Sequence, residues 1–166
     1  MVIGGQAVLL YGEPRLTKDI DITLGIGIER LMEIRAIVDR LKLNYLADNV
    51  DDFVKETMVL PVIDRKSGIR VDLIFSFSPY ERQAIEKARE ISIGRTKVKF
   101  ASLEDVVIHK MIAGRPRDME DIGSILVKNP SYDSPYIEKW LGEFDAALET
   151  RYRQGFRELQ EKLNPK

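Results

Sequence analysis

Two aspartates, Asp19 and Asp21, stand one residue apart in a run of alternating polar and apolar residues from Lys18 to Leu24. Such alternation predicts a half-buried β-strand, on which residues i and i+2 face the same side of a sheet. The two carboxylates are therefore expected about 6–7 Å apart on one face. Paired carboxylates bind hard cations such as Mg²⁺, and two such ions form the clamp used in phosphoryl and nucleotidyl transfer.

Asp72 is the best candidate for the third carboxylate that such a site requires. It stands among apolar residues in a predicted strand within residues 68–75, after a predicted turn over residues 64–68. A carboxylate in an apolar strand is costly unless a cation or hydrogen bonds compensate it. This cost favours a functional role, but the sequence leaves open the simpler interpretation that Asp72 pairs with Arg70 on the same strand face.

A glycine pair, Gly4-Gly5, follows the short apolar run Val2-Ile3 and precedes a predicted helical segment that starts at Gln6. Glycine lets the backbone approach a ligand closely, and the free N–H groups at a helix start favour an anion. A strand, a glycine pair and a helix therefore predict a phosphate site close to the carboxylate strand. A plain turn at the glycines is the alternative interpretation.

The remaining pattern predicts the elements that must position these residues. Helices are predicted over residues 27–41 and 78–90, and Asp51-Asp52 is expected to cap a short helix through residue 56. A strand over residues 57–63 should pair with the Asp72 strand as a hairpin, with Pro61 indicating an edge or a bulge. A further strand covers residues 96–100, and helical segments follow from Ser102, from residue 117 and over residues 134–163. This order predicts an α+β fold, a small mixed sheet with helices packed on one side.

Composition excludes several classes of protein. The 166-residue chain has a net charge of −1, so no overall basic field attracts it to nucleic acid, although an RNA acceptor is left open. It contains no cysteine and one histidine, which excludes thiolate chemistry and argues against a Cys/His zinc site. No apolar run has the length of a membrane-spanning helix, and no signal peptide is recognisable, so we expect a cytoplasmic protein with no membrane partner.

The spacing of the glycines and the aspartates points to a known family. Gly4-Gly5, a gap of 13 residues and then Asp19-Ile-Asp21-Ile resembles the signature of the DNA polymerase beta-like nucleotidyltransferase superfamily. The whole string over residues 4–22 is similar to minimal nucleotidyltransferase-like proteins of bacteria and archaea, including relatives of the AbiEii toxins. The resemblance covers roughly residues 1–125. Resembling proteins usually carry an N-terminal helix and a fuller first strand, so either this start is internal to a longer natural chain or the first strand is short.

The resemblance implies an activity and a division of the chain. It implies a nucleotidyltransferase catalytic domain over residues 1–128, with residues 129–166 as a helical extension packed on it. Asp19, Asp21 and Asp72 would be the catalytic and metal-binding residues for two Mg²⁺ ions. The substrate would be a nucleoside triphosphate, with ATP expected, and the acceptor a hydroxyl of a protein, an RNA or a small molecule. The alternative is a catalytically silent nucleotide- or partner-binding module of a toxin–antitoxin-type pair, which would have a cognate protein partner.

Several residues are candidates for holding the triphosphate. Gly4, Gly5 and Gln6 belong to the predicted phosphate site, and Arg15 and Lys18 lie between it and the carboxylate strand. The resembling family commonly places a lysine at the position of Lys110, which implies a triphosphate contact, with a solvated lysine as the alternative. Two aspartates of the next helix, Asp118 and Asp121, are expected to cap that helix and to orient Lys110 or Arg117 rather than to bind metal.

Overall fold

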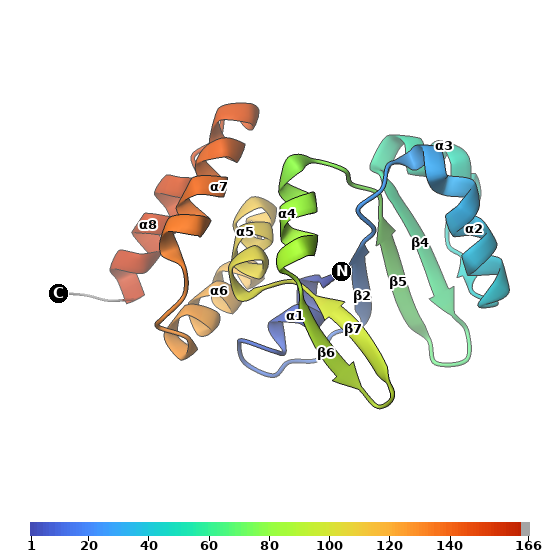
Figure 1. Ribbon diagram of the computed structural model, residues 1–166, viewed down its shortest axis with the longest axis horizontal. Helices are drawn as coiled ribbons and strands as arrows, with labels where there is room; N and C mark the ends of the chain where they lie inside the picture. The colour runs from blue at the N-terminus through green and yellow to red at the C-terminus, as the bar shows by residue number, and fades with distance from the viewer. Residues whose placement is uncertain (164–166) are drawn as a thin grey trace. The chain divides into compact units, whose positions relative to one another are not determined.

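The computed structural model describes residues 1–163 and contains a seven-stranded mixed sheet with the order β3-β4-β5-β2-β1-β7-β6 (Figure 1). The strands are β1 (Val2–Ile3), β2 (Asp19–Thr23), β3 (Asn44–Tyr45), β4 (Val59–Asp64), β5 (Ile69–Ile74), β6 (Arg89–Ile93) and β7 (Thr96–Phe100). The helices are α1 (Gly4–Val8), the 3₁₀ helix η1 (Ile28–Arg30), α2 (Leu31–Arg40), α3 (Val50–Thr57), α4 (Pro79–Lys87), α5 (Leu103–Ala113), α6 (Pro116–Lys128), α7 (Ser134–Leu148) and α8 (Tyr152–Leu163). The predicted α+β class is confirmed.

The chain forms two compact units, and each is assembled from two stretches of sequence. The first unit comprises Met1–Gln6 and Leu16–Phe100 and includes every strand of the sheet. The second comprises Ala7–Arg15 and the chain from Ala101 onward, and it includes α5 to α8. The domain boundary predicted between residues 128 and 129 falls inside the second unit. Residues 164–166 of the predicted helical extension lie outside the described residues.

The hydrophobic core of the first unit lies on one face of its sheet, beneath α2 and α3 (Figure 1). Its buried members are Leu31, Ile34 and Val38 from α2, Val50 and Val54 from α3, Leu60 and Val62 from β4, and Phe75. Val71 and Leu73 of β5 pack against this cluster. Because side chains alternate along a strand, Arg70 and Asp72 project from the opposite face of β5. The apolar pattern of this hairpin thus fixes the side on which its charged residues lie.

The second unit is a group of helices with its own apolar core. Fully buried side chains come from α5 to α8, among them Ile108, Ile122, Ile125, Leu141 and Phe156. The N-terminal stretch of the unit is fastened to these helices by hydrogen bonds. The Tyr11 hydroxyl donates to the Ala101 carbonyl at 2.8 Å, and the Asn129 amide donates to the Tyr11 carbonyl at 2.9 Å.

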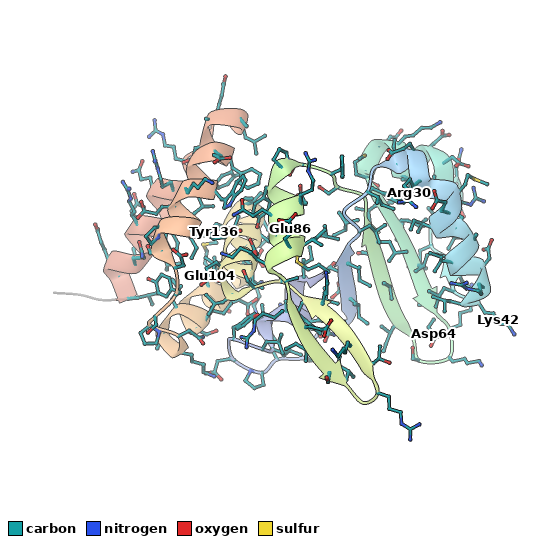
Figure 2. The ribbon with its side chains drawn as sticks, viewed as in Figure 1. Arg30, Lys42, Asp64, Glu86, Glu104 and Tyr136 are labelled. Atoms are coloured by element: carbon teal, nitrogen blue, oxygen red, sulfur yellow. The ribbon has the colours of Figure 1, made fainter. Side chains whose placement is uncertain are left out.

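A hydrogen bond between a partly buried tyrosine and a buried aspartate joins α5 and α7. The Tyr136 hydroxyl (Figure 2) donates to Oδ1 of Asp105 at 2.9 Å, and Asp105 is 0% exposed. Burial, together with the negative charge of Asp105, raises the pKa of Tyr136 above its ordinary value. The hydroxyl therefore keeps its proton and remains a donor to the buried carboxylate.

No helix in residues 1–163 combines the length and the apolar character needed to cross a membrane.

Three local expectations from the sequence are corrected. The cap of α3 is Asn49, whose side chain accepts from the Asp52 N–H, so the expected cap at Asp51-Asp52 is wrong. β4 is not an edge strand, because β3 pairs with it. Pro61 is tolerated there because β3 is only two residues long and Pro61 stands just beyond the paired residues. The helical region after residue 134 divides at Glu149, which adopts a left-handed conformation with φ of 53°.

Candidate active site

The three aspartates meet on one face of the first unit because β2 and β5 are parallel neighbours. Their register places Asp21 beside Asp72 and Asp19 beside Arg70. Neighbouring strands lie about 4.8 Å apart, and residues i and i+2 of one strand about 6–7 Å apart. We call the resulting group of Asp19, Asp21, Arg70 and Asp72 the acidic face. It is the face opposite the hydrophobic core.

Arg70 is the positive charge of the acidic face. Its Nε donates to Oδ1 of Asp72 at 2.9 Å, with side-chain exposures of 50% for Arg70 and 15% for Asp72. This hydrogen bond, followed by the negative charges of Asp72, Asp19 and Asp21, raises the pKa of Arg70. The pairing that the sequence left open as the simpler interpretation of Asp72 is therefore present. In residues 1–163, no group of three or more acidic or histidine side chains is already arranged around a common point as metal ligands.

Gly4 is fitted closely against the acidic face. Residue Ile3 of β1 pairs with Asp21 in antiparallel register, and α1 begins at the next residue, Gly4. Gly4 has a φ of +62°, and a Cβ atom added there would lie 2.0 Å from Oδ2 of Asp21. The left-handed backbone conformation therefore favours glycine, and a larger residue would also have to move the Asp21 carboxylate. The Gln6 side chain, in the same short helix, donates to Thr17 Oγ1 at 2.6 Å and ties α1 to the segment that enters β2.

The donor set of the acidic face fits a hard divalent cation by its chemistry. Three carboxylates supply only oxygen ligands, which Mg²⁺ prefers. The absence of a side chain at Gly4 leaves room for the Asp21 carboxylate on this face. Asp72 already accepts a hydrogen bond from Arg70 at one of its two carboxylate oxygens, Oδ1.

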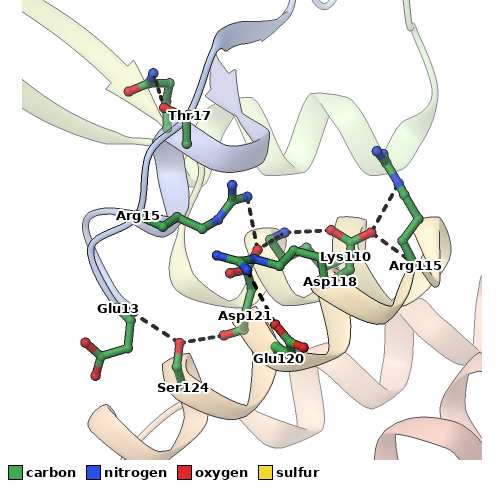
Figure 3. A network of polar contacts seen from close by, with 11 residues as sticks. Glu13, Arg15, Thr17, Lys110, Arg115, Asp118, Glu120, Asp121 and Ser124 are labelled. Carbon is green, nitrogen blue, oxygen red and sulfur yellow. Dashed lines mark hydrogen bonds and ion pairs between the residues drawn. The ribbon is translucent and has the colours of Figure 1, made fainter.

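A second charged cluster lies in the second unit (Figure 3). The Lys110 ammonium donates to Asp118 Oδ1 at 2.7 Å and to Asp121 Oδ2 at 2.6 Å. Arg15 Nη2 donates to the same Asp121 oxygen at 3.1 Å. Lys110, Asp118 and Asp121 are between 5% and 8% exposed. Asp118 and Asp121 therefore hold Lys110, as expected from the sequence, and we call these four residues the lysine network.

The candidate residues fall into two groups. Those in the first unit are Gly4, Gly5, Gln6, Lys18, Asp19, Asp21 and Asp72, whereas Arg15 and Lys110 belong to the second unit. Lys18 is exposed and immediately precedes β2. Sequence reasoning considered Arg70 only as a partner of Asp72 and missed its position beside Asp19. The register between strands about 50 residues apart carries no local sequence signal.

The match of nearly the whole chain to a family model places the protein in the nucleotidyltransferase class. Residues 1–162 match the family described as "Nucleotidyltransferase of unknown function (DUF6036)", and the chain belongs to this family. Solved structures with a similar fold include the antibiotic-resistance factor ANT(2'')-Ia, at 20% identity and a TM-score of 0.59 over 89% of this chain and 84% of that one. Another is an antigenic nucleotidyltransferase-like protein from Paracoccidioides brasiliensis, at 17% identity and a TM-score of 0.54 over 98% of this chain and 82% of that one. A comparison with curated protein sequences gives no match.

Proposed function

We propose that this protein is a Mg²⁺-dependent nucleotidyltransferase that moves a nucleoside monophosphate from a nucleoside triphosphate, with ATP expected, to a hydroxyl acceptor. The observation that carries the proposal is the register of β2 and β5, which brings Asp19, Asp21 and Asp72 to neighbouring positions of one sheet face. Membership of a nucleotidyltransferase family supports the same reaction class. The proposed location is the cytoplasm, where nucleoside triphosphates are available.

In the proposed reaction, Asp19, Asp21 and Asp72 would together hold two metal ions. Bound there, the ions would neutralise the triphosphate oxygens and lower the pKa of the acceptor hydroxyl. Asp72 would orient that hydroxyl and receive its proton. The acceptor oxygen forms a bond to the α-phosphorus while the bond from that phosphorus to pyrophosphate breaks in line.

The triphosphate contacts of this proposal come from backbone and side chains. Gly4 and Gly5, with the N–H of Gln6, would face phosphate oxygens, and the absence of side chains at the glycines supports a close approach. Lys18 is a further candidate because it is exposed and immediately precedes Asp19 in the chain. Arg15 and Lys110 remain predicted contacts, with both side chains bound to Asp121 in this structure.

A catalytically silent nucleotide- or partner-binding module is the second candidate, with a cognate protein as its partner. One observation favours it, because Asp72 is paired with Arg70, a partner that accounts for its position without catalysis. Mg²⁺-dependent nucleotide binding without pyrophosphate release would select this alternative.

The first test measures nucleotide binding by calorimetry, with and without Mg²⁺, in Asp19→Asn and Asp21→Asn. Each change keeps the shape of the side chain and removes its charge. We expect Mg²⁺-dependent binding to weaken about tenfold or more, with the fold retained because crowded like charges are relieved. Asp48→Asn is the matched control, since Asp48 is exposed in a loop of the same unit. An unchanged titration in both site variants would refute the metal assignment.

The second test identifies the acceptor and then examines Asp72. Incubating the protein with each labelled nucleoside triphosphate, Mg²⁺ and cell lysate shows which molecule becomes labelled. With that acceptor, Asp72→Asn should leave nucleotide affinity nearly unchanged and lower turnover on the order of 10²-fold, as for a lost general base. Equal turnover in wild type and Asp72→Asn would reduce the site to two carboxylates and favour the binding module.

A further inference from the structure

The acidic face contains its own cation, placed where it competes with a metal ion. The parallel register sets Arg70 beside Asp19, and Asp72 stands two residues further along the same strand face. Arg70 is therefore next to two of the three carboxylates and diagonal to the third, Asp21. No other basic residue of β2 or β5 shares this position among the described residues.

Arg70 and a metal ion would draw on the same carboxylate, that of Asp72. Arg70 Nε donates to Oδ1 of Asp72 at 2.9 Å, so one of the two oxygens of this proposed ligand already carries a hydrogen bond to a cation. The Asp72 side chain is 15% exposed, whereas that of Arg70 is 50% exposed. Arg70 thus has room to swing into solvent, while the carboxylate stays in place on the strand.

We propose that Arg70 is a positioning residue that holds the acidic face together without metal and sets its affinity for divalent cations by competing for Asp72. This inference rests on the proposed metal-dependent function and deepens it. A cation held by Asp72 would share that carboxylate with Arg70 or displace it, whereas a cation held by Asp19 and Asp21 would not meet this hydrogen bond. The Asp72-dependent position would consequently be the weaker one and the last to be filled.

The experiment measures binding of Mn²⁺ alone, by electron paramagnetic resonance, to wild type and to Arg70→Gln. Removing one positive charge from the acidic face should tighten binding on the order of tenfold, the Coulomb energy in water of a single and a double charge held about 6 Å apart. Arg70→Lys keeps the charge and should stay within about threefold of wild type. Arg65→Gln is the matched control, because Arg65 is an exposed arginine in the turn between β4 and β5 and loses the same charge.

A double variant shows whether the tighter Mn²⁺ binding expected for Arg70→Gln depends on the Asp72 carboxylate. Relative to Asp72→Asn alone, adding Arg70→Gln should tighten binding by less than Arg70→Gln does in wild type, because Arg70 no longer competes for a charged ligand. If Arg70→Gln binds Mn²⁺ no more tightly than wild type, the inference is overturned while the metal site stands. If Arg65→Gln tightens binding as much as Arg70→Gln, a general charge effect replaces the inference. If neither wild type nor Arg70→Gln binds Mn²⁺, both the inference and the proposed function fail.

Discussion

Replacing Lys110 by methionine should destabilise the second unit strongly, because it removes the cation from the lysine network. The ammonium lies 2.7 Å from Asp118 and 2.6 Å from Asp121, and the three side chains are between 6% and 11% exposed. Removing one partner of a buried ion pair typically costs about 3–5 kcal/mol, because a buried charge remains uncompensated. Arg15 still contacts Asp121 at 3.1 Å and Arg115 contacts Asp118 at 3.3 Å. We therefore expect the lower end of the range, about 3 kcal/mol.

The measurement is urea unfolding followed by tryptophan fluorescence. The sequence contains one tryptophan, Trp140, which is buried in α7 of the second unit and so reports on that unit. With a urea dependence of about 2 kcal/mol per molar, the loss corresponds to a midpoint lowered by about 1.5 M. Lys128→Met is the control. Its contact with Glu13 is 2.8 Å long, but the side chains are 42% and 67% exposed, so a loss below about 1 kcal/mol is expected.

A rescue variant separates lost charge from lost packing. Adding Asp118→Asn and Asp121→Asn to Lys110→Met removes the buried negative charges that the first change leaves without their cation. More than half of the lost free energy of unfolding should return, since replacing a whole buried ionic group is often neutral. A loss below about 1 kcal/mol in Lys110→Met itself would refute the reasoning. So would a triple variant that is less stable than the single one.

Three further variants test other parts of the structure. Gly4→Ala should lower the free energy of unfolding by about 2 kcal/mol or more in thermal unfolding, because φ is +62° and the new Cβ would lie 2.0 Å from Oδ2 of Asp21. Adding Asp21→Ala should recover part of this loss. Tyr136→Phe should cost about 1–3 kcal/mol in urea unfolding, since the fully buried Asp105 loses a donor at 2.9 Å, and an unchanged midpoint would contradict this. The hydrogen bond from Arg157 lowers the pKa of Glu138 below the ordinary 4.5. The contribution of this pair to stability is therefore present above pH 4.5 and is lost as pH falls through the lowered pKa. Glu138→Gln should accordingly lower Tm slightly at pH 7, and this difference should shrink as pH falls below the ordinary 4.5, whereas an effect that does not change with pH would contradict the pairing.

Elements with a strong local pattern were predictable from the sequence. The alternating run around Asp19 is β2, and the hairpin that carries Asp72 is β4 and β5. Ser102 caps α5, as its position before Glu104-Asp105 indicates. In each case the signal is local, because side-chain alternation and helix caps are set by residues within a few positions of one another.

Features that depend on distant segments were not predictable. β3 is two residues long, too short to give a periodic pattern, and it exists because β4 offers it an edge. The placement of Arg70 beside Asp19 depends on the register of two strands separated by about 50 residues, which tertiary packing decides. The sequence predicted a cap for α3 at Asp51-Asp52, whereas the cap in the structure is Asn49. Asparagine and aspartate both cap helices well, so residue type alone did not distinguish the two positions.

The division of the chain has a consequence for how the protein is made. Residues 7–15 leave the ribosome near the start of synthesis, yet the helices they join begin after residue 101. Residues 7–15 can therefore pack against the helices of the second unit only after nearly the whole chain has been synthesised. Contacts between segments so far apart in the sequence slow folding. If the polypeptide were cut after residue 100, the N-terminal fragment would still contain residues 7–15, which pack in the second unit. Genetic dissection should instead keep this N-terminal stretch with the helices, for example by joining residues 7–15 to residue 101 through a flexible linker.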